Sequence, residues 1–163
     1  MSAWHVEADN LLSRLPWHAN PCLDDMGGEM KPVVEVTIPI KIVSEANTTG
    51  AWRTKARRVK EQKRVVTLVM SQFDVRLVKL PAVVRFTRLS FGELDTDNLA
   101  SSCKAARDSV AAWLGIDDGD VTRVMYQYAQ GMAPRKTYAL KVEVFGGCRL
   151  RETVEPASEG GNT

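Results

Sequence analysis

The acidic residues of the chain are concentrated between residues 91 and 120, in a pattern that suits a metal ion. This stretch holds seven Asp or Glu residues against two Lys or Arg. Five of the carboxylates fall into two short groups: Asp95, Asp97, Asp117, Asp118 and Asp120. Mg²⁺ is a hard cation that proteins hold through one or two carboxylates, with water and substrate phosphate completing its shell. These aspartates are therefore candidate ligands of Mg²⁺, with Mn²⁺ as an expected substitute.

A helix through this stretch would place three charged side chains on one face. Asp97, Lys104 and Asp108 are separated by seven and four residues, close to whole numbers of helical turns. Helical geometry alone cannot bring the turn at 117–120 back to Asp97, so the fold would have to do this. A purely structural interpretation also stays open, because aspartate is a common helix cap and turn residue. A calcium EF-hand is excluded, since neither aspartate group is followed by the required Gly and Glu.

The preceding segment, residues 41–90, is strongly basic, with twelve Lys or Arg against three Asp or Glu. Four of these cations, spaced i, i+4, i+7 and i+11, would lie within about 60° of one another on a helix. We call them the basic ridge: Arg53, Arg57, Lys60 and Arg64. Such a ridge suits a phosphate backbone, because each phosphate contact releases a counterion. Alternatively it is an ordinary solvated helix face, although only Glu61 is available there for pairing.

Length and composition limit what the chain can be. Its 163 residues suit one domain, and 44% hydrophobic with 26% charged residues is typical of a soluble globular protein. No apolar run reaches the roughly 18 residues of a membrane helix, and the start of the chain lacks the form of a secretory signal. Three cysteines, odd in number and widely spaced, argue against a disulfide scaffold and fit a reducing cytoplasm. We therefore expect a cytoplasmic protein without a membrane partner.

Other catalytic layouts find no support in the sequence. It contains no GxSxG, Walker or GxGxxG motif. The two histidines, His5 and His18, and the lack of a CxxC pair leave no zinc-type cluster. A Cys–His nucleophile would have to recruit one of these N-terminal histidines. The acidic segment and the basic ridge are thus the features that indicate chemistry.

These residues need a scaffold, and the hydrophobic pattern predicts one of the α+β class. The expected elements are strand 33–43, helix 54–73, strand 83–89, a helix from Asp95 or Asp97 to Gly115, and strands 121–129 and 137–145. The expected buried face of the second helix consists of Leu99, Cys103, Ala106, Val110 and Trp113. We predict a single domain of β-α-β-α-β-β order, in which a mixed sheet packs against two helices.

The predicted domain covers residues 32–147. Residues 1–31 form an N-terminal extension of unknown role, in which prolines and a Gly-Gly pair interrupt a short amphipathic segment. Residues 148–163 are polar and end in a Gly-rich stretch, so we expect a disordered tail. All the candidate functional residues fall within the central domain.

The acidic segment resembles the signature of the RusA-like Holliday junction resolvases, small endodeoxyribonucleases often encoded by phages and prophages. The likeness begins with residues 94–99 (LDTDNL) and continues through Lys104, Asp108 and residues 115–118 (GIDD). It covers roughly residues 33–145, including the opening strand and the basic helix. The resemblance implies an α+β nuclease domain that works in the cytoplasm of a bacterium or a phage-infected host.

Carried over by position, the resemblance assigns roles to single residues. The family's Mg²⁺-binding aspartates, which are also catalytic, match Asp95, Asp97 and Asp118, and its catalytic lysine matches Lys104. The acid one turn after that lysine matches Asp108. Two further carboxylates stay open as alternatives to Asp118: Asp117 and Asp120.

The position of the lysine departs from the family pattern. In the prototype the lysine lies one helical turn after the second aspartate, a place that Ser101 occupies here. Lys104 comes two turns after Asp97 instead, which corresponds to a rise of roughly 10.5 Å along a helix. A lysine side chain that leans toward the helix N-terminus would recover part of this distance.

The implied reaction is Mg²⁺-dependent hydrolysis of a DNA phosphodiester in recombination and repair, with branched DNA such as a four-way junction as partner. Lys104 would neutralise charge on the scissile phosphate or its leaving group. The basic ridge would hold the DNA arms by shape, because phosphates carry no sequence information. Two symmetric nicks imply a homodimer. Two alternatives stay open: a non-catalytic nucleic-acid-binding domain whose aspartates only cap and turn, and a related nuclease acting on flaps or replication forks.

Overall fold

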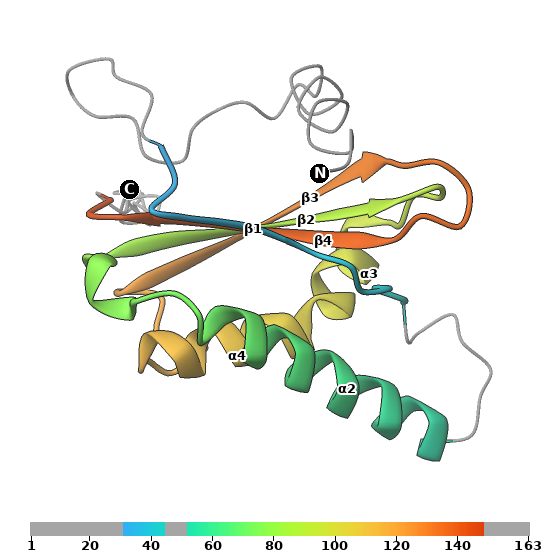
Figure 1. The fold of residues 1–163 in the computed structure, drawn as a ribbon, viewed down its shortest axis with the longest axis horizontal. Coiled ribbons are helices and arrows are strands. Elements are labelled where there is room, and N and C mark those ends of the chain that lie inside the picture. The colour runs from blue at the N-terminus through green and yellow to red at the C-terminus, as the bar shows by residue number, and fades with distance from the viewer. Residues whose placement is uncertain (1–30, 45–51, 149–163) are drawn as a thin grey trace, which may run out of the picture.

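The protein forms two layers, a four-stranded sheet with its helices on one face, in a computed structural model that describes residues 31–44 and 52–148 (Figure 1). The elements in chain order are β1 (Val34–Ile38), α2 (Trp52–Met70), the 3₁₀ helix η1 (Val75–Leu77), β2 (Ala82–Ser90), α3 (Thr96–Ser102), α4 (Lys104–Leu114), β3 (Val124–Met132) and β4 (Ala139–Gly146). This confirms the predicted α+β class and the alternation of strands and helices. The expected N-terminal extension and C-terminal tail lie, except for Lys31 and Cys148, outside the described residues.

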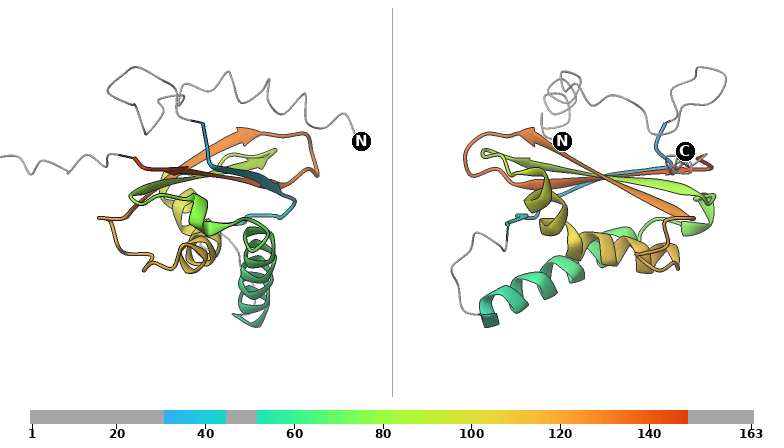
Figure 2. Two further views of the ribbon diagram at one scale, coloured as in Figure 1. Left: turned by 60° about the vertical axis from the view of Figure 1, so that its left-hand side comes forward. Right: turned by 180° about the vertical axis from the view of Figure 1, so that it is seen from behind.

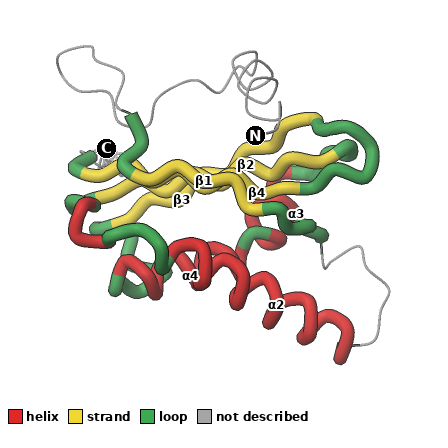
Figure 3. Tube along the Cα trace, viewed as in Figure 1, coloured by secondary structure: helices red, strands yellow, loops and turns green. Residues whose placement is uncertain are grey.

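The sheet is mixed, with the strand order β1-β4-β2-β3. β4 pairs antiparallel with both β1 and β2, whereas β2 and β3 run parallel, with Ala82 opposite Val124 and Ser90 opposite Met132. A parallel pair requires a crossover connection, and α3 followed by α4 supplies it. The turned views of Figure 2, and the tube of Figure 3 in the view of Figure 1, show these helices and α2 on the same face of the sheet. The crossover therefore carries the chain from the end of β2, past α2, to the start of β3.

The hydrophobic core lies between the sheet and the helices. Alternate residues of β2 and β4, such as Phe86 and Leu140, point toward the helices and are fully buried. From α2 they meet Val66 and Met70, which are also fully buried. The predicted inner face of the second helix is confirmed, because four of its members are at most 4% exposed and the fifth packs against the core: Leu99, Cys103, Ala106, Val110 and Trp113.

The single helix predicted from Asp95 to Gly115 is wrong in one respect, because it is broken at Cys103. The structure has two helices there, and Cys103 lies between them with φ −85° and ψ 0°. The Ser101 hydroxyl donates to the Asp97 carbonyl at 2.8 Å, and the Ser102 hydroxyl donates to the Leu99 carbonyl at 2.7 Å. Such back-bonding by serine bends helices. Asp97 and Lys104 therefore do not share one continuous helix.

Several strand limits also differ from the prediction, each for a local reason. β1 ends at Ile38 rather than continuing to Val43, because Pro39 has no amide hydrogen to donate to a strand ladder. β3 begins at Val124, three residues later than expected, because the Asp120 carboxylate holds Thr122 and Arg123 in a turn.

The described part of the chain contains two of the three cysteines. Cys103 is a free, buried thiol, whereas Cys148 is disulfide-bonded. The expectation that an odd cysteine number indicates a reducing compartment therefore loses its support, and a cytoplasmic location stays a prediction. Across residues 31–44 and 52–148, no helix combines the length and the apolar character needed to cross a bilayer.

The packing of the core predicts different costs for the same substitution at two leucines. Leu140 is fully buried, whereas Leu68 on α2 is 60% exposed. Leu140→Ala should lower the free energy of unfolding by about 2–5 kcal/mol through lost burial and a cavity. Leu68→Ala should change it by about 0.5 kcal/mol or less. Urea denaturation of both variants measures the two values, and equal losses would contradict the described orientation of α2.

Candidate functional site

A cluster of charged side chains surrounds the first turns of α4. Arg107 Nη2 donates to Asp118 Oδ2 at 2.9 Å, and Lys104 Nζ lies 3.9 Å from the same oxygen. Lys104 Nζ also donates to Asp108 Oδ1 at 3.4 Å, and Lys63 Nζ is 2.8 Å from Asp108 Oδ2. We call these five residues the α4 charge cluster. Three cations and two carboxylates leave it with one formal positive charge.

Three elements bring this cluster together. Lys104, Arg107 and Asp108 lie at i, i+3 and i+4 on α4, so they share one face of that helix. Lys63 comes from α2, which packs against α4. Asp118 comes from the turn that follows α4, after Gly115 has ended the helix in the left-handed conformation with φ 70°. The sequence prediction that Lys104 and Asp108 lie together is confirmed.

The turn at 117–120 uses its three aspartates differently. Asp117 Oδ1 accepts a hydrogen bond from the Gly119 amide at 2.8 Å, which shapes the turn. Asp120 accepts from Thr122 with Oδ1 and from Arg123 with Oδ2, and these hydrogen bonds lower the pKa of Asp120 to about 2. Asp118 instead reaches back to α4. Asp118 therefore differs from Asp117 and Asp120, because its described contacts reach α4 whereas theirs stay within the turn.

The other acidic pair lies at the start of α3. Asp95 is the N-cap residue of this helix, and its Oδ2 accepts from Asn98 Nδ2 at 3.4 Å. Asn98 Oδ1 in turn accepts from the buried Ser44 hydroxyl at 3.2 Å. Asp97 lies in the first turn of α3. Neither aspartate forms an ion pair with a side chain of the described residues, which leaves both carboxylates uncompensated.

The loop leading to Asp95 is held by two side chains from the sheet. Gln130 of β3 accepts from the Leu94 amide at 2.9 Å and donates to the Leu94 carbonyl at 2.7 Å. Arg88 of β2, only 8% exposed, donates to the carbonyls of Gly92 and Ile42. These bonds fix the approach to α3 from both the strand before it and the strand after it.

The structure does not gather Asp95, Asp97 and Asp118 into one site. Within residues 31–44 and 52–148, no three carboxylate, histidine or cysteine side chains are placed to share a metal ion. The crossover explains this, because Asp95 and Asp97 lie at the start of α3 whereas Asp118 follows α4. The chemistry of the donors still suits Mg²⁺, since uncompensated carboxylate oxygens are its preferred protein ligands and one or two of them suffice.

Lys104 is oriented differently from the expectation. The sequence suggested a lysine leaning back along one helix toward Asp97. In the structure the amino group extends the other way, toward Asp108 and Asp118, because the break at Cys103 makes Lys104 the first residue of a separate helix.

The basic ridge is exposed along α2, as predicted for a solvated or phosphate-binding face. The N-terminal half of α2 slopes away from the sheet (Figures 1 and 2). Arg64 is partly neutralised, because it forms a salt bridge with Glu61 at 2.8 Å. Arg53 lies over the exposed Trp52 ring at 5.6 Å from its centroid. The ridge therefore presents mainly Arg53, Arg57 and Lys60 to a partner.

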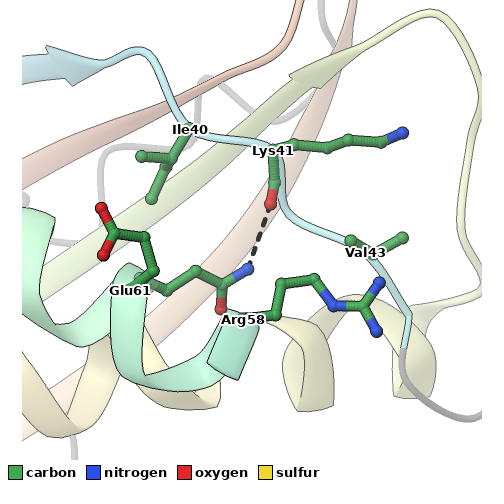
Figure 4. Close-up of a pocket in the computed structure, with 6 residues that line it drawn as sticks. Ile40, Lys41, Val43, Arg58 and Glu61 are labelled. Carbon is green, nitrogen blue, oxygen red and sulfur yellow. Dashed lines mark hydrogen bonds between the residues drawn. The ribbon is translucent and has the colours of Figure 1, made fainter. Parts of the chain in front are cut away.

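A shallow groove of about 270 Å³ runs between α2 and the segment that follows β1. Figure 4 shows Ile40 and Val43 on one side and Arg58 and Glu61 on the other, with Gln62 donating to the Lys41 carbonyl at 3.0 Å. This hydrogen bond ties the segment to the helix. The surface of the groove is mainly apolar, so we assign it no catalytic role and treat it as part of the surface beside the basic ridge.

Two members of the α4 charge cluster were missed at the level of sequence, Lys63 and Arg107. A signal for Arg107 exists, because it lies one turn after Lys104 and so shares its face. The sequence contains no such signal for Lys63, because its partner Asp108 is 45 positions away and the two meet only where α2 packs on α4.

The chain matches no known protein-family profile and no curated protein sequence at a significant level.

The ion pair of Lys63 with Asp108 predicts that the pKa of the Asp108 carboxyl group is lowered, which a titration can measure. Burial alone would raise the pKa of Asp108, but the hydrogen bond and charge of Lys63, followed by those of Lys104, outweigh it and lower this pKa. The pair therefore stabilises the fold above the unfolded pKa of about 3.9, and this contribution is lost as the pH falls through the lower folded value.

Lys63→Gln should raise the pKa of Asp108 and reduce stability at neutral pH by about 1 kcal/mol or less, with no difference remaining at about pH 2. Carbon-detected NMR titration of the carboxyl group and urea denaturation measure the two effects. Lys60→Gln, one turn earlier on the exposed ridge, is the control and should leave the pKa of Asp108 unchanged. An unshifted pKa of Asp108 in Lys63→Gln would show that the pair does not form in solution.

Proposed function

We propose that the protein is a Mg²⁺-dependent endodeoxyribonuclease that binds branched DNA and resolves Holliday junctions by paired phosphodiester hydrolysis. The resemblance of the acidic segment to the RusA-like resolvases suggests this class. The structural observation that supports it is the 2.8 Å contact between Lys63 and Asp108, which joins the helix of the basic ridge directly to the α4 charge cluster. A phosphate backbone bound along α2 would thus run toward the candidate catalytic residues.

In this proposal the basic ridge binds the DNA arms. Arg53, Arg57 and Lys60 are exposed on α2, so their side chains are accessible to a DNA duplex. Arginine and lysine contacts to phosphates position DNA but carry no sequence information. Recognition would then depend on the shape of the branched substrate.

The resemblance assigns the metal ion to Asp95, Asp97 and Asp118, although the described residues do not gather these three carboxylates into one group. When bound, the ion would supply an activated water and offset negative charge at the scissile phosphate. Lys104, at the start of α4, would place its ammonium group near the same phosphate and stabilise the developing charge. Arg107 and Lys104 offset part of the negative charge of Asp118, since both lie within 4 Å of its Oδ2.

The proposal includes a homodimer and a cytoplasmic site of action. Resolving a junction needs two nicks related by two-fold symmetry, and two identical subunits supply two such sites.

A non-catalytic nucleic-acid-binding domain is the second candidate function. It is favoured by the separation of the carboxylates, because Asp95 lies at the N-cap position of α3 while Asp118 is paired with Arg107 beside α4. A related nuclease that acts on flaps or replication forks is a third. A labelled mobile junction, incubated with and without Mg²⁺ and with a flap substrate in parallel, separates the three: binding without cutting supports the second, and equally fast flap cleavage supports the third.

The central prediction concerns two aspartates. Asp97→Asn and Asp118→Asn should each reduce junction cleavage by orders of magnitude, because each removes one charge from the proposed Mg²⁺ site. Junction affinity in EDTA or Ca²⁺ should hold or improve, since a carboxylate no longer repels the phosphate. Asn keeps nearly the same shape, so the free energy of unfolding should change by less than about 1 kcal/mol.

Asp74→Asn is the matched control, because Asp74 is an exposed aspartate that caps η1, away from the α4 charge cluster. It should cut junctions at the unaltered rate. Folded Asp97→Asn and Asp118→Asn variants that also cut at that rate would mean that these aspartates only cap and turn.

The basic ridge can be tested through salt dependence. The triple variant Arg53→Glu, Arg57→Glu, Lys60→Glu should weaken junction binding, and each lost phosphate contact should flatten the log–log salt slope by about 0.9. A control with the same charge change is Lys31→Glu, Lys79→Glu, Lys136→Glu, which alters three exposed lysines away from α2. Fluorescence anisotropy over a series of salt concentrations measures both slopes. Equal slopes in the two variants would make the ridge an ordinary solvated face.

A further inference from the structure

The face of the sheet opposite the helices, which we call the outer face, carries side chains that are well buried. Successive strand residues point to opposite faces, so Val83 of β2 and Phe145 of β4 lie on this side. Both are buried, and with Cys148 they form a hydrophobic cluster separate from the main core. The side chains of Lys141 and Glu143, farther along the same face, are only 11% and 12% exposed. This degree of burial points to a layer that covers the outer face.

The described residues supply only a small part of such a layer. All the helices lie on the other side of the sheet (Figure 2). The guanidinium group of Arg85 lies over the Phe145 ring, 5.4 Å from its centroid, and shields that ring. One side chain of the sheet itself does not amount to a second layer. The rest of the cover has to come from chain outside the described residues.

A disulfide bond indicates which segment this is. Cys148 belongs to the hydrophobic cluster of the outer face and is disulfide-bonded. The chain has three cysteines, and Cys103 is a free thiol buried in the main core. Within one chain, Cys22 is the cysteine that remains as the partner. Because a disulfide usually holds two Cα atoms about 4.4–6.8 Å apart, the bond would bring residue 22 to the end of β4.

The direction of the chain is compatible with this bond. β1 and β4 are antiparallel, with Val34 opposite Val144, so the start of β1 lies beside the end of β4. The chain therefore enters β1 close to Cys148. Cys22 precedes Lys31, the first described residue, by nine positions, and an extended chain of this length spans at most about 30 Å. Residue 22 is thus within reach of Cys148.

The composition of residues 1–30 also suits a cover. The sequence indicates a short amphipathic segment there, with five large apolar side chains: Trp4, Leu11, Leu12, Leu15 and Trp17. An amphipathic segment is stabilised by burying its apolar side against another apolar surface. The cluster of the outer face is such a surface.

We propose that the N-terminal extension, residues 1–30, packs on the outer face of the sheet and is fastened there by a disulfide bond between Cys22 and Cys148. This inference does not depend on the proposed nuclease function. Cytosolic thiols are kept reduced, so the fastening closes only under oxidising conditions. With glutathione disulfide as the oxidant, the two sulfurs join, both thiol hydrogens are transferred, and two molecules of reduced glutathione are formed.

The bond can be tested by counting thiols in the full chain after oxidation with glutathione disulfide and removal of the excess. In denaturant without reductant, a thiol reagent should label Cys103 alone, and after reduction it should label all three cysteines. Mass spectrometry of a non-reduced tryptic digest should find the peptide of Cys22 joined to that of Cys148. Three free thiols before reduction, glutathione attached to either cysteine in place of the link, or a covalent dimer on a non-reducing gel would each overturn the bond.

The cover can be tested by hydroxyl-radical labelling of phenylalanines, read out by mass spectrometry. In the oxidised protein Phe145 should react as slowly as Phe86 of the main core, and more slowly than Phe91, which is 47% exposed. Reduction, or the substitution Cys22→Ser, should raise the labelling of Phe145 by about threefold or more, because an unfastened segment loses its high effective concentration at the sheet. The labelling of Phe86 should not change.

The matched control is Cys103→Ala, which removes the other described cysteine and leaves the bond intact. It should keep the slow labelling of Phe145. Oxidised protein in which Phe145 reacts as fast as Phe91 would show an open outer face and overturn the proposal. Equal protection of Phe145 in Cys22→Ser and in the unaltered protein would also overturn it, in favour of another cover such as residues 149–163. The reduced, unaltered protein gives the same comparison without a substitution.

Discussion

Because β2 and β3 run parallel, the chain between them has to return from one end of the sheet to the other, and it does so through α3 and α4. Every candidate functional residue except the basic ridge and Lys63 is placed by this crossover. The loop at its start carries Asp95, its middle carries Lys104 and Arg107, and the turn at its end carries Asp118. The inner faces of both helices are buried against the sheet, so the positions of the charged residues follow from the packing of the core.

The charges on α2 and α4 form one continuous system because the two helices pack against each other. Lys63 and Asp108 connect them, Lys104 bridges Asp108 and Asp118, and Arg107 completes the series at the turn. Lysine and arginine thus outnumber the carboxylates where a polyanion would approach. Asp95 and Asp97 at the start of α3 form no ion pair with the described residues, so negative charge is left uncompensated at that end of the crossover.

The sequence was informative wherever a short-range pattern decides the structure. The 3.6-residue period located α2 and the buried residues Leu99, Ala106 and Val110, and alternating β-branched residues located β1. Local hydrogen bonds between side chain and backbone were not readable from the pattern, so the break at Cys103 and the late start of β3 were missed. For the site, helical spacing paired Lys104 with Asp108. The pairing of Lys63 with Asp108, and of Arg107 with Asp118, depends on tertiary packing and on the path of a turn, neither of which leaves a periodic signal.

The bend at Cys103 changes the direction of the chain without changing which residues face the sheet. Leu99, Cys103, Ala106 and Val110 keep the spacing of a single helix, and all four are buried. Hydrogen bonds from the Cys103 amide to the Leu99 carbonyl and from the Arg107 amide to the Cys103 carbonyl cross the junction. An insertion of three residues after Leu99 would turn everything downstream by about 300° and move these buried residues toward solvent. The number of residues between the Asp-x-Asp-Asn segment and the lysine is therefore tied to the packing of the core.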